Sequence, residues 1–417
     1  MGIYLNPDSS RFEEAVNSDI YIDKTGLLNY TNSVLHTMQK YICISRPRRF
    51  GKSIAANMLA AYYSRGCDAR ELFSQFEIAE SDTFEKHLNQ YNTIFVNMQE
   101  MSSRSKNVQE LVARFQKLII RELKSEYPEV EYFDEDDLTL CMQDVYVQTK
   151  QTFVIIIDEW DCIFREYKTD REAQEKYLDF LRDLLKDKAY IHLAYMTGIL
   201  PIKKYGTHSA LNMFDEFSMI DPGPLACYVG FTEEEVKGLC EQYQMDMGEV
   251  KSWYDGYSFE KTLSIYSPRS VVNCMRLGKI GNYWNQTETY EALKIYIQMD
   301  MDGLQDSVVR MLAGEAVQIN IGTFSNDMTT FATKDDVLTL LIHLGYLTYN
   351  SVDGTVAIPN KEVSQEYVNA ISTMNWHGVI DSVESSRKLL ESLWAMDADA
   401  VAAGVDKAHD EISILQY

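Results

Sequence analysis

The chain has 417 residues, enough for two or three domains with a large buried core. Its formal net charge of −24 disfavours non-specific binding of nucleic acid by the chain as a whole. No run of about 18 apolar residues occurs, and the seven scattered cysteines include no CxxC pair, which excludes a membrane span and a disulfide or zinc framework. We therefore expect a cytoplasmic globular protein.

Through about residue 200, short apolar segments rich in β-formers alternate with longer helical patterns. Strands are predicted at residues 40–47, 92–99, 152–161 and 190–200. Helices are predicted at residues 54–66, 111–123 and 171–188. This alternation predicts an α/β domain with a mostly parallel sheet.

Beyond Asp221 the pattern becomes mainly helical. Thr232, with Glu235 three residues later, is typical of a capping box at a helix start. From Thr333 onward we expect a capped helix, a strand, an Asp-Gly turn and a second strand. A helix followed by a β-hairpin resembles a winged helix-turn-helix unit.

The segment SRPRRFGKSIA, residues 45–55, joins the first predicted strand to the first predicted helix. Gly51, Lys52 and Ser53 stand where a P-loop has its glycine, its phosphate-binding lysine and its magnesium-binding hydroxyl. Arg46 takes the place of the motif's first glycine, which weakens the match but leaves the phosphate contacts. We predict that nucleotide is bound by Arg46, Pro47, Arg48, Arg49, Phe50, Gly51, Lys52, Ser53 and Ile54.

The strand in VIIIDEWD supplies the second half of such a site. Asp158 fits the acid that holds magnesium together with Ser53, and Glu159 fits the base that polarises the attacking water. An additional strand and a glutamate beside the aspartate resemble the catalytic-glutamate branch of P-loop ATPases. Thr197, at the end of the next strand, fits the γ-phosphate sensor of AAA+ proteins, and an ordinary strand-ending threonine is the alternative.

Eight motifs resemble, in content and order, the bacterial AAA-ATPase-like proteins that often carry a C-terminal PD-(D/E)XK nuclease domain. They are DIYIDKTGLL, SRPRRFGKS, IIIDEWD, MTGIL, GFTEEEV, WYDGYSF, YSPRS and LGYLTYN with IPN, within residues 11–372. The resemblance implies that the Arg-Pro-Arg-Arg form of the loop is a normal variant.

The resemblance also implies that Tyr21, Asp23 and Lys24 lie near the nucleotide. It leaves two roles open for Arg48 and Arg49, which either face phosphate or a neighbouring subunit, or pair with the acids of DEWD. Arg269 could report the γ-phosphate from a helical lid, although a structural role is favoured. For the aromatic residues of WYDGYSF, core packing is favoured over base stacking.

The predicted fold is an α/β P-loop NTPase core with a mostly parallel, AAA+-like sheet, a helical lid and a winged-helix-like C-terminal domain. The expected boundaries are 1–220 for the ATPase domain, 221–315 for the lid, 316–375 for the winged-helix-like domain and 376–417 for a helical segment. That last segment would lead to a nuclease domain that the chain lacks. After Ile371 no Glu-x-Lys follows a predicted strand, so we expect no nuclease activity.

The predicted activity is magnesium-dependent ATP hydrolysis, with ATP and Mg²⁺ bound and with Lys52, Glu159 and Thr197 as catalytic residues. Hydrolysis would act as a switch or motor for a partner or an appended nuclease domain. The alternative is a nucleotide-gated module that binds protein or DNA with little turnover. A protein partner or a homo-oligomer is expected, nucleic acid is not supported by the net charge, and no membrane association is expected.

Overall fold

The computed structural model describes residues 2–202, 211–259, 263–284, 290–299, 301–374, 385–386, 388–390 and 392–414. Part of the predicted helical segment, residues 376–384, lies outside this set. None of the described helices is both long and apolar enough to cross a membrane.

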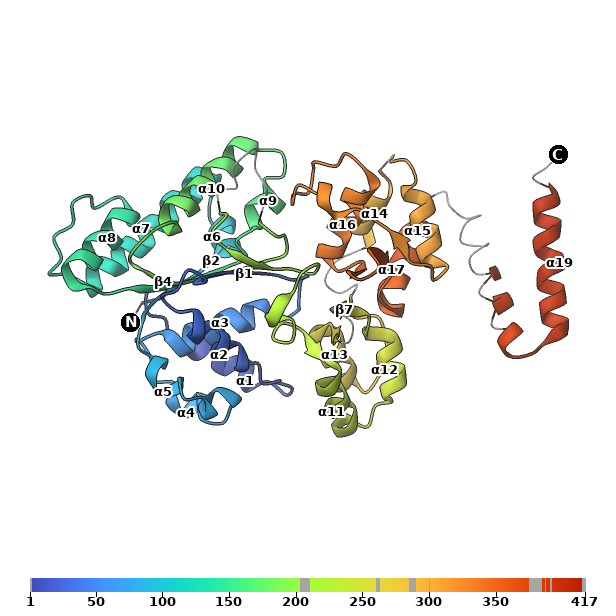
Figure 1. Ribbon diagram of the computed structural model, residues 1–417, viewed down its shortest axis with the longest axis horizontal. Coiled ribbons are helices and arrows are strands. Elements are labelled where there is room, and N and C mark those ends of the chain that lie inside the picture. Colours follow the sequence, from blue (N-terminus) through green and yellow to red (C-terminus); the bar gives the residue numbers. More distant parts are fainter. Residues whose placement is uncertain are drawn as a thin grey trace.

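A five-stranded parallel sheet forms the centre of the N-terminal half (Figure 1). Its strands are β1 (Tyr41–Ser45), β2 (Asn92–Asn97), β3 (Phe153–Asp158), β4 (Ile191–Gly198) and β5 (Asp215–Phe217). Their order is β2-β3-β4-β1-β5, so β4 separates the loop-bearing strand β1 from the acidic strand β3. The register places Ile44 beside Thr197 and Asn97 beside Asp158, which brings polar residues together at one edge of the sheet.

Helices cover both faces of this sheet, and β1 and β3 are therefore buried along their whole length. On one face lie α1 (Ser10–Val16), α2 (Gly26–Val34), α3 (Lys52–Tyr63), α4 (Arg70–Phe73) and α5 (Phe84–His87) (Figure 1). On the other lie α6 (Met98–Ser103), α7 (Val108–Glu126), α8 (Leu138–Thr149), α9 (Cys162–Glu166) and α10 (Arg171–Leu185). The result is the predicted α/β P-loop core.

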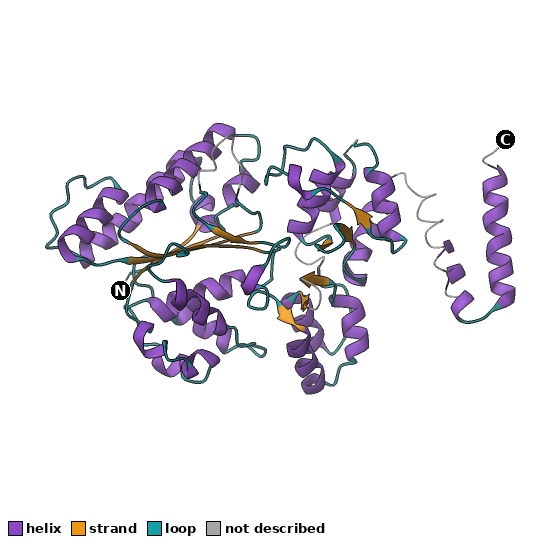
Figure 2. Cartoon of the chain, in the orientation of Figure 1, coloured by secondary structure: helices purple, strands orange, loops and turns teal. Residues whose placement is uncertain are grey.

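A smaller unit of helices and short strands follows (Figure 2), at the place of the predicted helical lid, and we call it the lid after that prediction. It has its own apolar cluster. It contains β6 (Phe231–Thr232), α11 (Glu233–Tyr243), α12 (Met247–Tyr254), β7 (Tyr257–Phe259), β8 (Leu263–Tyr266) and α13 (Pro268–Leu277). The predicted capping box is confirmed, because Thr232 and Glu235 exchange side chain–backbone hydrogen bonds at the start of α11. Ile20 and Ile22, from the N-terminal segment, pack against this cluster.

The C-terminal module comprises residues 290–374, without Asp300, which is not described. It contains α14 (Tyr290–Ile297), α15 (Leu304–Leu312), β9 (Val317–Gln318), α16 (Lys334–Leu344), β10 (Thr348–Asn350), β11 (Thr355–Ala357) and α17 (Lys361–Ser372). The three strands form an antiparallel sheet in the order β10-β11-β9. Its buried residues form one continuous cluster with those of the sheet domain, whereas α19 (Ala398–Ile414) stands apart (Figure 1).

Candidate nucleotide-binding site

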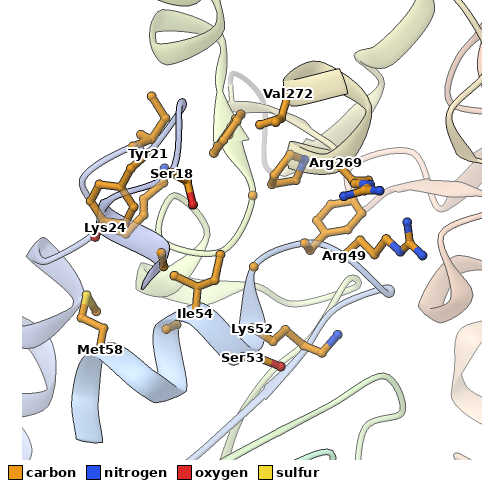
Figure 3. Close-up of a pocket in the computed structure, with 18 of the residues that line it drawn as sticks. Ser18, Tyr21, Lys24, Arg49, Lys52, Ser53, Ile54, Met58, Arg269 and Val272 are labelled. Carbon is orange, nitrogen blue, oxygen red and sulfur yellow. The ribbon is translucent and has the colours of Figure 1, made fainter. Parts of the chain in front are cut away.

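A cavity of about 1040 Å³ opens where the N-terminal segment, the loop after β1 and the lid meet (Figure 3). The N-terminal segment contributes residues 17–22 and Lys24 to its lining. The loop contributes residues 48–55, and the lid side contributes residues around Gly230 and Arg269. The cavity therefore lies at the N-terminus of α3, where backbone N–H groups favour an anion.

The loop turns into α3 at Gly51, whose φ of 93° is a left-handed conformation that glycine adopts without strain. Lys52, in the first helical turn, is only 4% exposed, and its Nζ donates to the carbonyl of Pro47 at 2.9 Å. Burial lowers the pKa of Lys52, while Glu159, Asp158 and Asp161 oppose that shift through their negative charges. Ser53 is exposed to the cavity.

At the end of β3, the Asp158 carboxylate is buried and held by two neighbouring strands. The Thr197 hydroxyl of β4 donates to Asp158 Oδ1, and the Asn97 amide of β2 donates to Asp158 Oδ2 at 3.0 Å. Thr197 thus lies deep in the site, in direct contact with the acid proposed to hold magnesium.

Glu159 lines the cavity and is held by Arg165 of α9. Its φ of 56° is unusual for a residue other than glycine and is typical of strained positions at functional sites. Burial raises the pKa of Glu159, and the nearby Arg165 and Lys52 cations oppose that rise. Arg165 also approaches Asp161, with Nε at 3.4 Å from Oδ2.

Asp161 is fully buried and fixes the chain beyond β4. It accepts hydrogen bonds from the backbone N–H groups of Ile199 at 3.0 Å and Leu200 at 2.9 Å. Sequence reasoning missed Arg165. The available signal was its spacing, since it lies four residues after Asp161 at the start of a helix.

The structure brings most of the predicted site residues to this cavity. Those that line it are Tyr21, Lys24, Arg48, Arg49, Phe50, Gly51, Lys52, Ser53, Ile54, Glu159 and Arg269. Figure 3 shows Arg49, from the loop, and Arg269, from the lid, on the same side of the cavity as Lys52. The predicted residues that are absent from its lining are Arg46, Pro47, Asp23, Asp158 and Thr197.

Arg46 differs most from its expected place. Its side chain is fully buried, and Nη1 donates to the carbonyls of Ser45 at 2.9 Å and Phe217 at 3.0 Å. Its guanidinium lies 5.0 Å from the ring centre of Phe259 in the lid. The side chain therefore points into the protein, and only the backbone of Arg46 belongs to the loop.

The N-terminal residues divide between the cavity and its frame. Tyr21 lines the cavity and packs edge-on against Phe12 with ring centres 5.9 Å apart. Lys24 Nζ forms an ion pair with Glu235 of the lid at 2.6 Å. Asp23 accepts backbone hydrogen bonds from Thr25 and Glu77, both at 2.8 Å, which is a structural role.

The charge of the cavity lining is opposite to that of the whole chain. Seven basic residues line it, namely Lys24, Arg48, Arg49, Lys52, Arg165, Arg269 and Arg276, against the acids Asp19 and Glu159. In a chain of net charge −24, such a local excess of positive charge selects an anionic ligand.

The sheet order and the loop between β1 and α3 define a P-loop nucleotide-binding core of the α/β class. Residues 10–207 match the family model AAA-ATPase-like, described as predicted AAA-ATPase. This region of the chain is therefore similar to the AAA-ATPase-like family.

A relative from Azotobacter chroococcum mcd 1, named as an uncharacterized protein in the vnfD 5′ region, is 23% identical over 371 residues. The match covers 85% of this chain and 65% of that relative.

Among solved structures, the Aeropyrum pernix ORC2 protein in ADPNP–ADP complexes has a TM-score of 0.33 at 12% identity, covering 88% of this chain and 98% of that one. The replication initiator DnaA bound to AMPPCP and single-stranded DNA has a TM-score of 0.33 at 9% identity, covering 93% and 96%. These similarities are too remote to transfer a ligand or an activity.

Proposed function

We propose that this protein binds ATP with Mg²⁺ in the cavity and hydrolyses it, and that hydrolysis switches the position of the lid and the C-terminal module. The observation that carries the proposal is the meeting of Lys52, Asp158 and Glu159 at one edge of the sheet, beside a cavity whose charged lining residues are mainly basic. Phosphate-binding and water-activating groups are thus combined.

Each residue of the site would have a separate role. Lys52 and the N–H groups at the start of α3 bind the phosphates, and Glu159 accepts a proton from the attacking water. Magnesium, when bound, neutralises phosphate charge. Ser53 and Asp158 would hold it, because a hydroxyl and a carboxylate are the oxygen donors that this hard cation prefers. Thr197 orients Asp158 through its hydroxyl.

Replacement of Lys52 tests the proposal directly. Lys52→Ala should lower the rate of ATP hydrolysis roughly 100-fold or more, because a phosphate-binding cation is lost from a buried site. Lys124→Ala is the matched control, since Lys124 is a surface lysine paired with Glu135. A Lys52→Ala protein as active as the control would refute the assignment.

One observation favours the second candidate, a nucleotide-gated binding module with little turnover. Glu159 forms an ion pair with Arg165, which opposes the rise in the pKa of Glu159 that burial causes and engages the carboxylate that would accept the proton of water. Such a module would hold ATP tightly and release no phosphate, even when a partner protein or DNA is added.

We interpret the C-terminal module as a protein-contact element, with a winged-helix-like arrangement. Helix α16 is buried over most of its length and carries Asp335 and Asp336 in its first turn. A recognition helix for DNA needs an exposed face with basic or amide side chains. Loss of duplex DNA binding after substitutions in this module would reverse the interpretation.

A further inference from the structure

The loop between β1 and α3 directly contacts strand β7 of the lid and the end of α16 in the C-terminal module. Arg46 lies over Phe259, and the ring of Phe50 packs edge-on against Tyr257 with centres 5.3 Å apart. A Cβ atom added to Gly345, at the end of α16, would lie 2.8 Å from Pro47 Cγ. The loop positions that differ most from a glycine-rich P-loop therefore form a packed interface.

Strand β7 links this interface to the C-terminal module. The Tyr257 hydroxyl donates to the carbonyl of Gly345 at 2.6 Å, and Ser258 N–H donates to Thr348 Oγ1 at 3.4 Å. Tyr257 and Phe259 belong to the buried cluster that the sheet domain shares with the module. The rings of Tyr257 and Phe259 thus contact the loop, and the Tyr257 hydroxyl and the Ser258 N–H contact the module.

A second connection joins the module to the chain beyond Thr197. The Asn326 amide donates to the carbonyl of Ile202 at 2.7 Å. The Ser45 hydroxyl, just before the loop, donates to the carbonyl of Leu200 at 2.9 Å. Movement of the loop or of the end of β4 would therefore reach the module through contacts that already exist.

If stabilising this interface were the only role of Arg46, its buried guanidinium would be an energetically unfavourable choice of side chain. Its guanidinium is fully buried, and among the described residues Nε and Nη2 have no hydrogen-bond partner. Burying a cation with incomplete hydrogen bonding costs free energy. His343 of α16 lies near this cation, and burial together with Arg46 lowers the pKa of His343 to about 3, so the histidine stays neutral.

We propose that Arg46 is a positioning residue that couples the phosphate-binding loop to the C-terminal module through β7. Nucleotide bound by the loop would change the position or the stability of α16 within the same chain. This inference rests on the proposed nucleotide binding and adds to it the internal route by which the bound state reaches the module.

The test measures ATP binding and amide hydrogen exchange on the full chain, with magnesium and saturating ATP. In the parent, ATP should change the exchange rates of α16 by about threefold or more. Phe259→Leu should bind ATP within about threefold of the parent but lose that response, and Arg46→Met should lose the response as well. Arg46→Lys, which keeps a cation over Phe259, should recover part of it.

Phe95→Leu is the matched control. Phe95 is a buried ring that lies under Arg11 at 5.4 Å, in a different part of the sheet domain. The Phe95→Leu variant should lose stability as Phe259→Leu does, but ATP should still change the hydrogen exchange of α16. A full response in both Arg46→Met and Phe259→Leu would overturn the coupling, as would a parent that binds ATP without any response. A parent that binds no ATP would instead refute the proposed function, and the coupling with it.

Discussion

Three acids at the end of β3 have three different partners. Asp158 accepts from Thr197 and Asn97, Glu159 pairs with Arg165, and Asp161 accepts from the backbone beyond β4. Only Glu159 lines the cavity. The carboxylate that can meet a water molecule is therefore distinct from those that shape the site.

Arg165 is predicted to stabilise the fold through these acids. Arg165→Met should lower the free energy of unfolding by about 3 kcal/mol, because it leaves buried Asp161 and half-buried Glu159 without their cation. Urea unfolding measures the difference. Arg104→Met is the control, since Arg104 pairs with Glu100 at the surface and should cost under about 1 kcal/mol. Equal losses in the two variants would contradict this role.

At this scale the sequence predicts residues whose role follows from the local pattern. Gly51, Lys52 and Ser53 are recognisable because a strand, a turn and a helix surround them. The burial of Arg46 could not be predicted, since its partners Phe217 and Phe259 come from distant segments. Arg165 is a lone arginine in a short helix, and its role depends on tertiary contacts.

Among the structural elements, the loop after β1 and the end of α16 depend on each other. Gly345 ends α16 with a φ of 86°, and it lies against both Pro47 and Trp284. The left-handed conformation ends the helix, and the absence of a side chain allows the loop to approach.

Two glycine substitutions separate the effect of the left-handed backbone conformation from the effect of the close contact with the loop. Gly314→Ala, at φ 90° with open space around its Cβ position, should cost about 1 kcal/mol of stability from backbone strain alone. Gly345→Ala should cost more and should also weaken ATP binding, because the new methyl group would press on Pro47. Thermal unfolding and nucleotide titration measure both. Equal stability losses with unchanged ATP affinity would show that the contact with the loop is unimportant.

The elements that the sequence predicts well are those with a strong local pattern. The strand predicted at residues 152–161 is β3, which is shorter at both ends. The helix predicted at residues 171–188 is α10, which begins at the predicted residue and ends earlier, at Leu185. Strand β5 was not predicted, because Phe217 is its only buried residue. Its existence depends on pairing with β1, which is a long-range contact.

In the whole molecule, the lid and the C-terminal module meet at a buried carboxyl group. Glu362 of α17 accepts hydrogen bonds from the Ser270 hydroxyl of α13 at 2.8 Å and from the backbone N–H groups of Tyr283 and Trp284. Burial raises the pKa of Glu362 to about 7, although these hydrogen bonds act in the opposite direction.

This shift predicts a pH dependence of stability. A carboxyl whose pKa is higher in the folded state stabilises the fold most below its unfolded pKa, and this contribution is lost as the pH rises through about 7. Between about pH 4.5 and pH 8, the free energy of unfolding of the parent should fall by roughly 2–3 kcal/mol more than that of Glu362→Gln, because the glutamine cannot ionise.

Unfolding with urea at several pH values checks this difference. Glu172→Gln serves as the control, because Glu172 is an exposed carboxyl on α10 and its replacement should leave the pH profile of the parent unchanged. A Glu362→Gln profile parallel to that of the parent would show that Glu362 does not titrate in this range.

In the proposed function, ATP is hydrolysed in the cavity with Glu159 as the base. The most direct measurement is magnesium-dependent phosphate release by the parent chain and by Glu159→Gln, with ATP binding followed in both. We predict that the parent turns over and that the variant binds ATP but is slower by about 100-fold or more. A parent that binds ATP without hydrolysis, or a variant as active as the parent, would contradict it.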